Sequence, residues 1–165
     1  ALAVKEGTLK IRFASALTYM ETLLLTRAPD ESVATWIAVI KQSRRTYLNQ
    51  DFTLEQFREI PGRLWPVKLK LFPFNPVNGP PLFQLQKKRL QRPTYEHALC
   101  FAAIMRGYPR SVLFFHEPIY LSHVKHWGGL VTAIVQNNDY RYVCLPPANF
   151  DWKKGLWLAG VERIP

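Results

Sequence analysis

Two apolar runs joined by a short polar turn, over residues 130–145, constrain the fold more than any other stretch of the chain. Both runs, 130–136 and 140–145, are rich in the β-branched and aromatic side chains that favour strands. The NND tripeptide between them tolerates the backbone angles of a tight turn and therefore predicts a β-hairpin. The first run has almost no polar alternation, which indicates a central strand buried on both faces of a sheet.

Patterns elsewhere in the chain predict the other elements of an α+β domain. Alternating or short apolar runs predict further strands at 8–14, 66–72, 111–115 and 156–161. Apolar residues at helical spacing, preceded by capping residues, predict helices at 16–27, 31–48 and 94–106. We therefore expect a mainly antiparallel sheet with three to four packed helices, forming a single compact basic domain over residues 1–165.

The composition agrees with a folded domain. Of the 165 residues, 48% are hydrophobic and 21% are charged, so the chain can bury a core and is not expected to be disordered. No apolar run is long enough for a transmembrane segment. Cys100 and Cys144 both lie among apolar neighbours and are interpreted as buried thiols, which favours the cytoplasm or another reducing intracellular compartment.

Positive charge is concentrated in one region of the chain. The net charge is +10, and residues 41–92 alone hold eleven lysines and arginines against three acids. Such a regional excess indicates an anionic partner. Within this region, the many prolines of residues 73–92 predict an irregular loop, which ends in the basic QKKRLQR sequence.

This basic region predicts a surface for nucleic acid. Its cations could neutralise several phosphates, and the interleaved Trp65, Phe72 and Phe74 could stack on unpaired bases. The alternative is that these aromatic residues belong to the core and that the lysines are a solvated edge. The residues expected to contact nucleic acid are Arg63, Trp65, Lys68, Lys70, Lys87, Lys88, Arg89 and Arg92, together with Arg44 and Arg45. Arg44 and Arg45 could instead only complement the dipole at the end of the 31–48 helix.

Histidines provide the candidates for catalysis. His116 precedes Glu117, and a histidine beside a carboxylate suits proton transfer. His123 and His126 are spaced as neighbours on a helix. An enzyme acting on a polyanion, such as a nuclease, would therefore use His116, Glu117 and His123. Because no recognised zinc motif is present, we expect neither a metal nor another cofactor.

A further pair, His97 and Cys100, lies one helical turn apart in the sequence EHALCFAA. Side by side on a helix, they could form a thiolate–imidazole pair. Cys100, however, has mostly apolar neighbours, and burial makes a thiol unreactive. A structural role is therefore the favoured interpretation of this pair.

Together, these features favour a non-enzymatic protein that binds DNA or RNA, mainly through electrostatic contact between residues 63–92 and the phosphate backbone. It could be one subunit of a larger nucleoprotein complex with protein partners. Two alternatives stay open. One is the polyanion-directed enzyme, and the other is a protein–protein interaction module that uses the aromatic and proline-rich segments 72–83 and 146–152.

Overall fold

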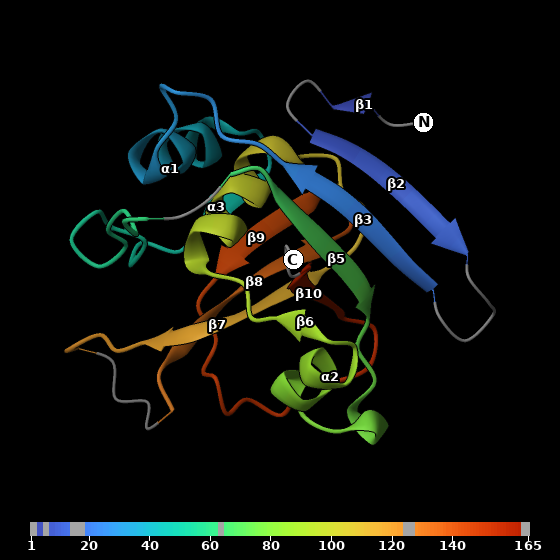
Figure 1. Ribbon diagram of the computed structural model, residues 1–165. Coiled ribbons are helices and arrows are strands. Elements are labelled where there is room, and N and C mark those ends of the chain that lie inside the picture. Colours follow the sequence, from blue (N-terminus) through green and yellow to red (C-terminus); the bar gives the residue numbers. More distant parts are fainter. Residues whose placement is uncertain (1–2, 5–6, 14–18, 63–64, 124–127, 163–165) are drawn as a thin grey trace.

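Figure 1 shows a computed structural model of the protein, in which one sheet carries helices on both of its faces. The structure describes residues 3–4, 7–13, 19–62, 65–123 and 128–162. The expected α+β class is confirmed, with three helices packed against a mostly antiparallel sheet.

Ten strands of the described residues form the sheet. In chain order they are β1 (Ala3–Val4), β2 (Gly7–Phe13), β3 (Tyr19–Leu25), β4 (Thr46–Leu48), β5 (Val67–Pro73), β6 (Leu90–Gln91), β7 (Val112–Ile119), β8 (Leu130–Asn137), β9 (Tyr140–Cys144) and β10 (Trp157–Glu162). They are arranged in the order β1-β2-β3-β5-β10-β7-β8-β9-β4, and β6 pairs with β10 beside this path. Strand β10 runs parallel to β7, and β4 runs parallel to β9, while the hairpin of β8 and β9 is antiparallel as predicted.

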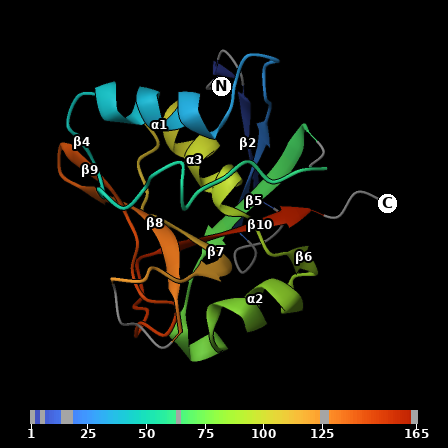
Figure 2. The same cartoon turned by 90° about the vertical axis from the view of Figure 1, so that its left-hand side faces the viewer.

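The two faces of the sheet carry separate apolar clusters. Helices α1 (Val33–Gln42) and α3 (Tyr95–Ile104) cover one face, with Trp36 and Phe101 in its core. On the other face, Leu85 of α2 (Pro81–Lys87) and Trp152 pack with Phe72. In Figures 1 and 2, α1 and α3 lie in the upper half of both views and α2 lies at the bottom.

Helix α3 agrees with the helix predicted at 94–106, and it is buried. All residues from 96 to 103 are buried, because the helix lies between α1 and the sheet. The helix begins with a capping box. The His97 backbone N–H donates to the Thr94 hydroxyl, and the Thr94 backbone N–H donates to His97 Nδ1. The helix thus begins after Thr94, two residues beyond Pro93.

The helix predicted at 16–27 is wrong, because β3 occupies most of this stretch. Glu21, Leu23 and Leu25 are fully buried, whereas the residues between them are half-buried, so burial repeats every second residue. Strand β3 pairs with β2 on one side and β5 on the other, which satisfies its backbone hydrogen-bonding groups.

The helix predicted at 31–48 is too long. Helix α1 begins after Ser32, whose hydroxyl accepts from the Thr35 backbone N–H, and it ends at Gln42. Residues 46–48 form strand β4 beside β9 instead. Arg44 and Arg45 therefore follow the helix and do not lie in its last turn.

The prediction of an irregular loop over residues 73–92 is wrong for its second half, which contains a helix and a short strand. A 3-10 turn (Pro76–Asn78) leads into α2, which has Pro81 in its first turn, and β6 follows. The buried Gln84 amide donates to the carbonyl oxygens of Asn75, at 2.6 Å, and Gly79, at 2.7 Å. This amide anchors the proline-rich segment to α2, and the basic residues after it stand on a defined helix end.

Two further sequence expectations concern cysteines and membranes. Cys100 is buried, Cys144 is half-buried, and both are free thiols. Burial raises the pKa of Cys144 to about 11, so this thiol is protonated and unreactive at neutral pH. Among the described residues, no helix combines the length and the apolar character needed to cross a bilayer.

Candidate nucleic-acid interface

The C-terminal end of α2 presents three consecutive exposed cations, Lys87, Lys88 and Arg89. None of them forms an ion pair with an acidic residue in the part of the chain that the structure describes. Arg89 adopts a φ of 57°, which ends the helix, and Lys88 Nζ lies 4.9 Å from the centroid of the Phe72 ring. The three cations are therefore accessible, and Lys88 lies next to β5.

Two lysines of β5 extend this cluster along the sheet. Lys68 is exposed, Lys70 is half-buried, and Phe72 follows them on the same face of the strand. Glu162 of β10 pairs with both, at 3.5 Å from Lys68 and 3.7 Å from Lys70. We refer to these five cations, Lys68, Lys70, Lys87, Lys88 and Arg89, as the α2/β5 basic surface. Glu162 is the one acid that pairs with it among the described residues.

The remaining predicted cations lie elsewhere or have structural partners. Arg92 Nε donates to the Phe115 carbonyl oxygen at 2.8 Å, and its guanidinium pairs with Glu117 at 3.2 Å, which joins β6 to β7. Arg44 and Arg45 stand before β4, where Arg45 pairs with Asp139 at 3.5 Å. The predicted contact Arg63 lies outside the described residues.

The aromatic residues expected beside the basic region do not form a stacking surface. Phe72 and Phe74 are buried, which confirms the alternative that they belong to the core. Trp65 is half-buried, and its ring lies 5.6 Å from those of Trp36 and His97. Its packing against these two rings stabilises the contact between the chain before β5 and the helices.

His116 lies on β7, is buried, and is engaged through both ring nitrogens. Nε2 lies 2.8 Å from the Thr132 hydroxyl, and Nδ1 lies 2.7 Å from the Glu117 carbonyl oxygen. Burial and, to a smaller extent, the positive charge of Arg92 lower the pKa of His116 to about 4, although the hydrogen bond to the Glu117 carbonyl oxygen acts in the opposite direction. The imidazole is therefore neutral at pH 7 and acts as a hydrogen-bonding core residue.

The other two candidate catalytic residues point to different partners. The Glu117 carboxylate is exposed and pairs with Arg92. His123 Nε2 lies 2.9 Å from Asp51, and no contact in the described structure joins His123 to His116 or Glu117. His126 lies outside the described residues, and those described contain no cluster of histidine, cysteine and acidic residues that could hold a metal.

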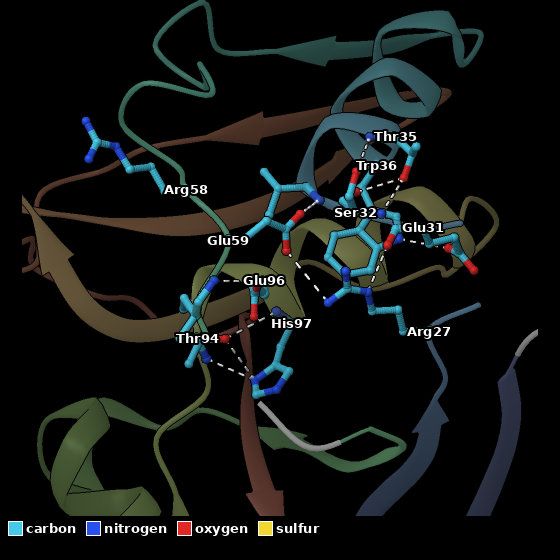
Figure 3. Close-up of polar contacts among 12 residues, drawn as sticks. Arg27, Glu31, Ser32, Thr35, Trp36, Arg58, Glu59, Thr94, Glu96 and His97 are labelled. Carbon is cyan, nitrogen blue, oxygen red and sulfur yellow. Dashed lines mark hydrogen bonds and ion pairs between the residues drawn. The ribbon is translucent and has the colours of Figure 1, made fainter. Parts of the chain in front are cut away.

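Figure 3 shows the polar contacts that surround His97 at the start of α3. The Thr94 N–H donates to His97 Nδ1 at 3.0 Å, while Glu96 accepts from the Ile60 N–H at 3.0 Å. Cys100 Sγ contacts the carbonyl oxygen of Thr26 at 3.8 Å. These contacts hold Ile60 against the beginning of α3. His97 and Cys100 therefore have a structural role.

Sequence reasoning missed a row of three exposed tyrosines, Tyr47 on β4 and Tyr140 and Tyr142 on β9, which we call the tyrosine row. Tyr47 stacks on Tyr142, with ring centroids 5.3 Å apart and planes 15° apart, and lies 5.7 Å from Tyr140. The period-two alternation of β9 was a usable signal, because it places Tyr140 and Tyr142 on one face and buries Arg141 and Val143 on the other.

The chain was compared with protein-family models, with curated proteins and with solved structures, and none of these comparisons gave a match. The function therefore has to be argued from the chemistry of the surface itself.

Proposed function

We propose that the protein binds nucleic acid, DNA or RNA, through electrostatic contact between the α2/β5 basic surface and the phosphate backbone. The observation that carries this proposal is the exposed Lys87-Lys88-Arg89 cluster, which pairs with no acid in the described part of the chain. Cations without internal partners can release the counterions condensed on a polyanion, and this release drives binding.

The arrangement of the cations favours a polymer over a small anion. They follow the end of α2 and the face of β5 and so form an extended row, and Lys87 and Lys88 also line an open hollow with Asn78 and Gln84. Lysine and arginine contacts to phosphates position a protein on nucleic acid without reading its sequence. A place in a larger nucleoprotein complex, with protein partners, belongs to the same proposal.

The contacts of the histidines favour binding without catalysis. His116 is buried and neutral, and its two ring nitrogens already have partners, so it has no free position from which to attack or protonate a polyanion. A nuclease would need a different set of residues.

Charge reversal at Lys87, Lys88 and Arg89, each to Glu, is expected to weaken binding at least about tenfold and to flatten its dependence on salt. The slope of log affinity against log salt concentration should fall in magnitude by about 2–3, since each phosphate contact contributes about 0.7–0.9. Fluorescence anisotropy with labelled oligonucleotides between about 50 and 200 mM salt measures both quantities.

The matched control reverses Lys41, Arg58 and Arg106, which are exposed near the helices of the opposite face. This variant has the same net charge as the first one, so it should lose affinity only through long-range electrostatics and should keep most of the slope. Equal losses and equal slopes in the two variants would contradict a local site at the end of α2.

A further inference from the structure

The tyrosine row lies on a part of the sheet that no described helix covers. We infer that this face, formed by β4, β9 and the end of β8, binds single-stranded nucleic acid by stacking of its bases. The inference rests on the proposed function and names its substrate class. The basic surface would then hold the backbone, while the tyrosines recognise unpaired bases.

The face is open because its covering elements stop short of it. Leu85 of α2 and Trp152 of the segment before β10 cover part of this face, in one apolar cluster with side chains from four strands, Phe72, Leu113, Val131 and Leu158. Beyond Cys144, which packs at the edge of this cluster, no described helix lies over the tyrosine side of β9 and β4, and α1 and α3 lie on the other face (Figure 2). Tyr47, Tyr140 and Tyr142 are consequently 54%, 43% and 38% exposed.

Three neighbouring aromatic rings on a rigid sheet suit base stacking. Tyr47 pairs in register with Tyr142 across β4 and β9, so the backbone hydrogen bonds of the sheet fix the positions of both residues. Every base has a flat face that can continue a stack of aromatic rings, whatever its identity. In a duplex these faces are covered by neighbouring base pairs, so the site would select unpaired strands.

An apolar cavity of about 410 Å³ continues the face beyond Tyr142. Val135 and Cys144 line it, and Val135 is the register partner of Tyr142. Phe150, which is exposed and lies 5.0 Å from the Trp152 ring, forms another wall. The volume lies within the range of about 300–1,000 Å³ that is typical of small-ligand pockets, so a base could occupy it.

Cations stand at both ends of this apolar surface and explain why an anionic strand is the favoured occupant. Lys153 and Lys154 line the cavity, while Arg44 and Arg45 precede Tyr47 at the other end. Lys153 and Arg45 pair with Asp151 and Asp139, at 2.6 and 3.5 Å. Arg44 and Lys154 have no acidic partner among the described residues. A strand whose bases stack on the tyrosines would have cations for its phosphates on either side.

The test compares four labelled probes of about 12 units, within the size range of single-strand sites. They are oligo(dT), oligo(U), an abasic strand with the same number of phosphates, and a DNA duplex. The two single strands with bases, oligo(dT) and oligo(U), should bind at least about fivefold more tightly than the abasic strand, because stacking adds to the phosphate contacts.

Tyr47→Ala and Tyr142→Ala should each lower the affinity for oligo(dT) or oligo(U) by about 5- to 100-fold, without changing the affinity for the abasic strand or the salt slope. Tyr142→Phe should retain binding, because stacking needs the ring and not the hydroxyl. Tyr120→Ala is the matched control, since Tyr120 is another exposed tyrosine outside the row. Thermal unfolding of each variant verifies that the sheet is intact.

Equal binding of the abasic and base-containing strands, or alanine variants that bind like the unchanged protein, would overturn the inference. If binding then still depends on Lys87, Lys88 and Arg89, the proposed function stands without it. Absence of binding to every probe at about 50 mM salt would overturn both. Light scattering without nucleic acid tests the alternative of a protein partner. If the protein self-associates, if Tyr142→Ala abolishes the self-association, and if the probes show no preference for bases, this face binds protein.

Discussion

Replacing Glu21 by alanine is expected to lower the free energy of unfolding by about 3–5 kcal/mol, the usual effect of removing one partner of a buried ion pair. Glu21 lies on β3 and is 0% exposed. It accepts a hydrogen bond from the Tyr108 hydroxyl and pairs with the Arg110 guanidinium, which also lies over the Trp157 ring at 4.2 Å. The variant removes the buried carboxylate that both groups face. Urea denaturation of the two proteins at pH 7 measures the loss.

The matched control is Glu117→Ala. Glu117 also pairs with an arginine, Arg92, but its side chain is 88% exposed. Solvent screens such a pair, so the change should cost less than about 1 kcal/mol. If Glu21→Ala costs no more than this control, the buried network does not stabilise the fold.

Burial raises the pKa of Tyr108, and the carboxylate of Glu21 raises it further, so the hydroxyl stays protonated in the fold. It therefore donates a hydrogen bond to Glu21 throughout the physiological range. This network joins residues that are far apart in the sequence, in β3 and in the segment after α3. The sequence alone could not reveal it, because no local pattern connects position 21 with positions 108 and 110.

The fold was predictable where local signals sufficed. The hairpin of β8 and β9 needs only its own two runs and the turn between them, in which Asn138 has a φ of 54°. Helix α3 has a capping box and an apolar interior. Both elements were predicted with nearly correct bounds.

Predictions failed where a distant strand decides the structure. The leucines of β3 are compatible with a helix or a strand, and pairing with β2 and β5 selects the strand. Residues 46–48 likewise do not continue the helix predicted at 31–48. They form β4 because β9, about a hundred residues further along the chain, provides its backbone partners. Tertiary pairing thus overrides helical spacing in both cases.

The candidate site likewise has one part that local sequence predicts and another that depends on the tertiary fold. That Lys87, Lys88 and Arg89 are exposed follows from their charge, and the structure confirms it. Which aromatic residues are accessible does not follow from residue type. Phe72 is buried because α2 folds over it, whereas Tyr142 is exposed because no described helix lies over its side of β9. The basic cluster was therefore predictable, and the tyrosine row became visible only with the topology of the sheet.

Lowering the pH from 6.5 toward 4 is expected to remove about 3 kcal/mol of stability through His116 alone, because its pKa falls from 6.5 in the unfolded chain to about 4 in the fold. Below pH 6.5 the unfolded chain takes up a proton at this histidine, while the folded protein does not. The contribution is therefore fully present above pH 6.5 and is lost as the pH falls through about 4. Urea denaturation at a series of pH values measures this dependence.

His116→Gln separates this effect from the titration of carboxylates, because glutamine keeps a hydrogen-bonding side chain but cannot be protonated in this range. The variant should be less stable than the unchanged protein at pH 7, since glutamine does not reproduce both hydrogen bonds of the ring. Its free energy of unfolding should nevertheless fall less steeply as the pH is lowered. The curves of stability against pH for the variant and the unchanged protein should therefore converge in acid. His123→Gln changes an exposed histidine that pairs with Asp51 at the surface, and should leave the steep acid dependence in place. Parallel curves for His116→Gln and the unchanged protein would mean that carboxylates, and not the buried imidazole, govern the loss of stability in acid.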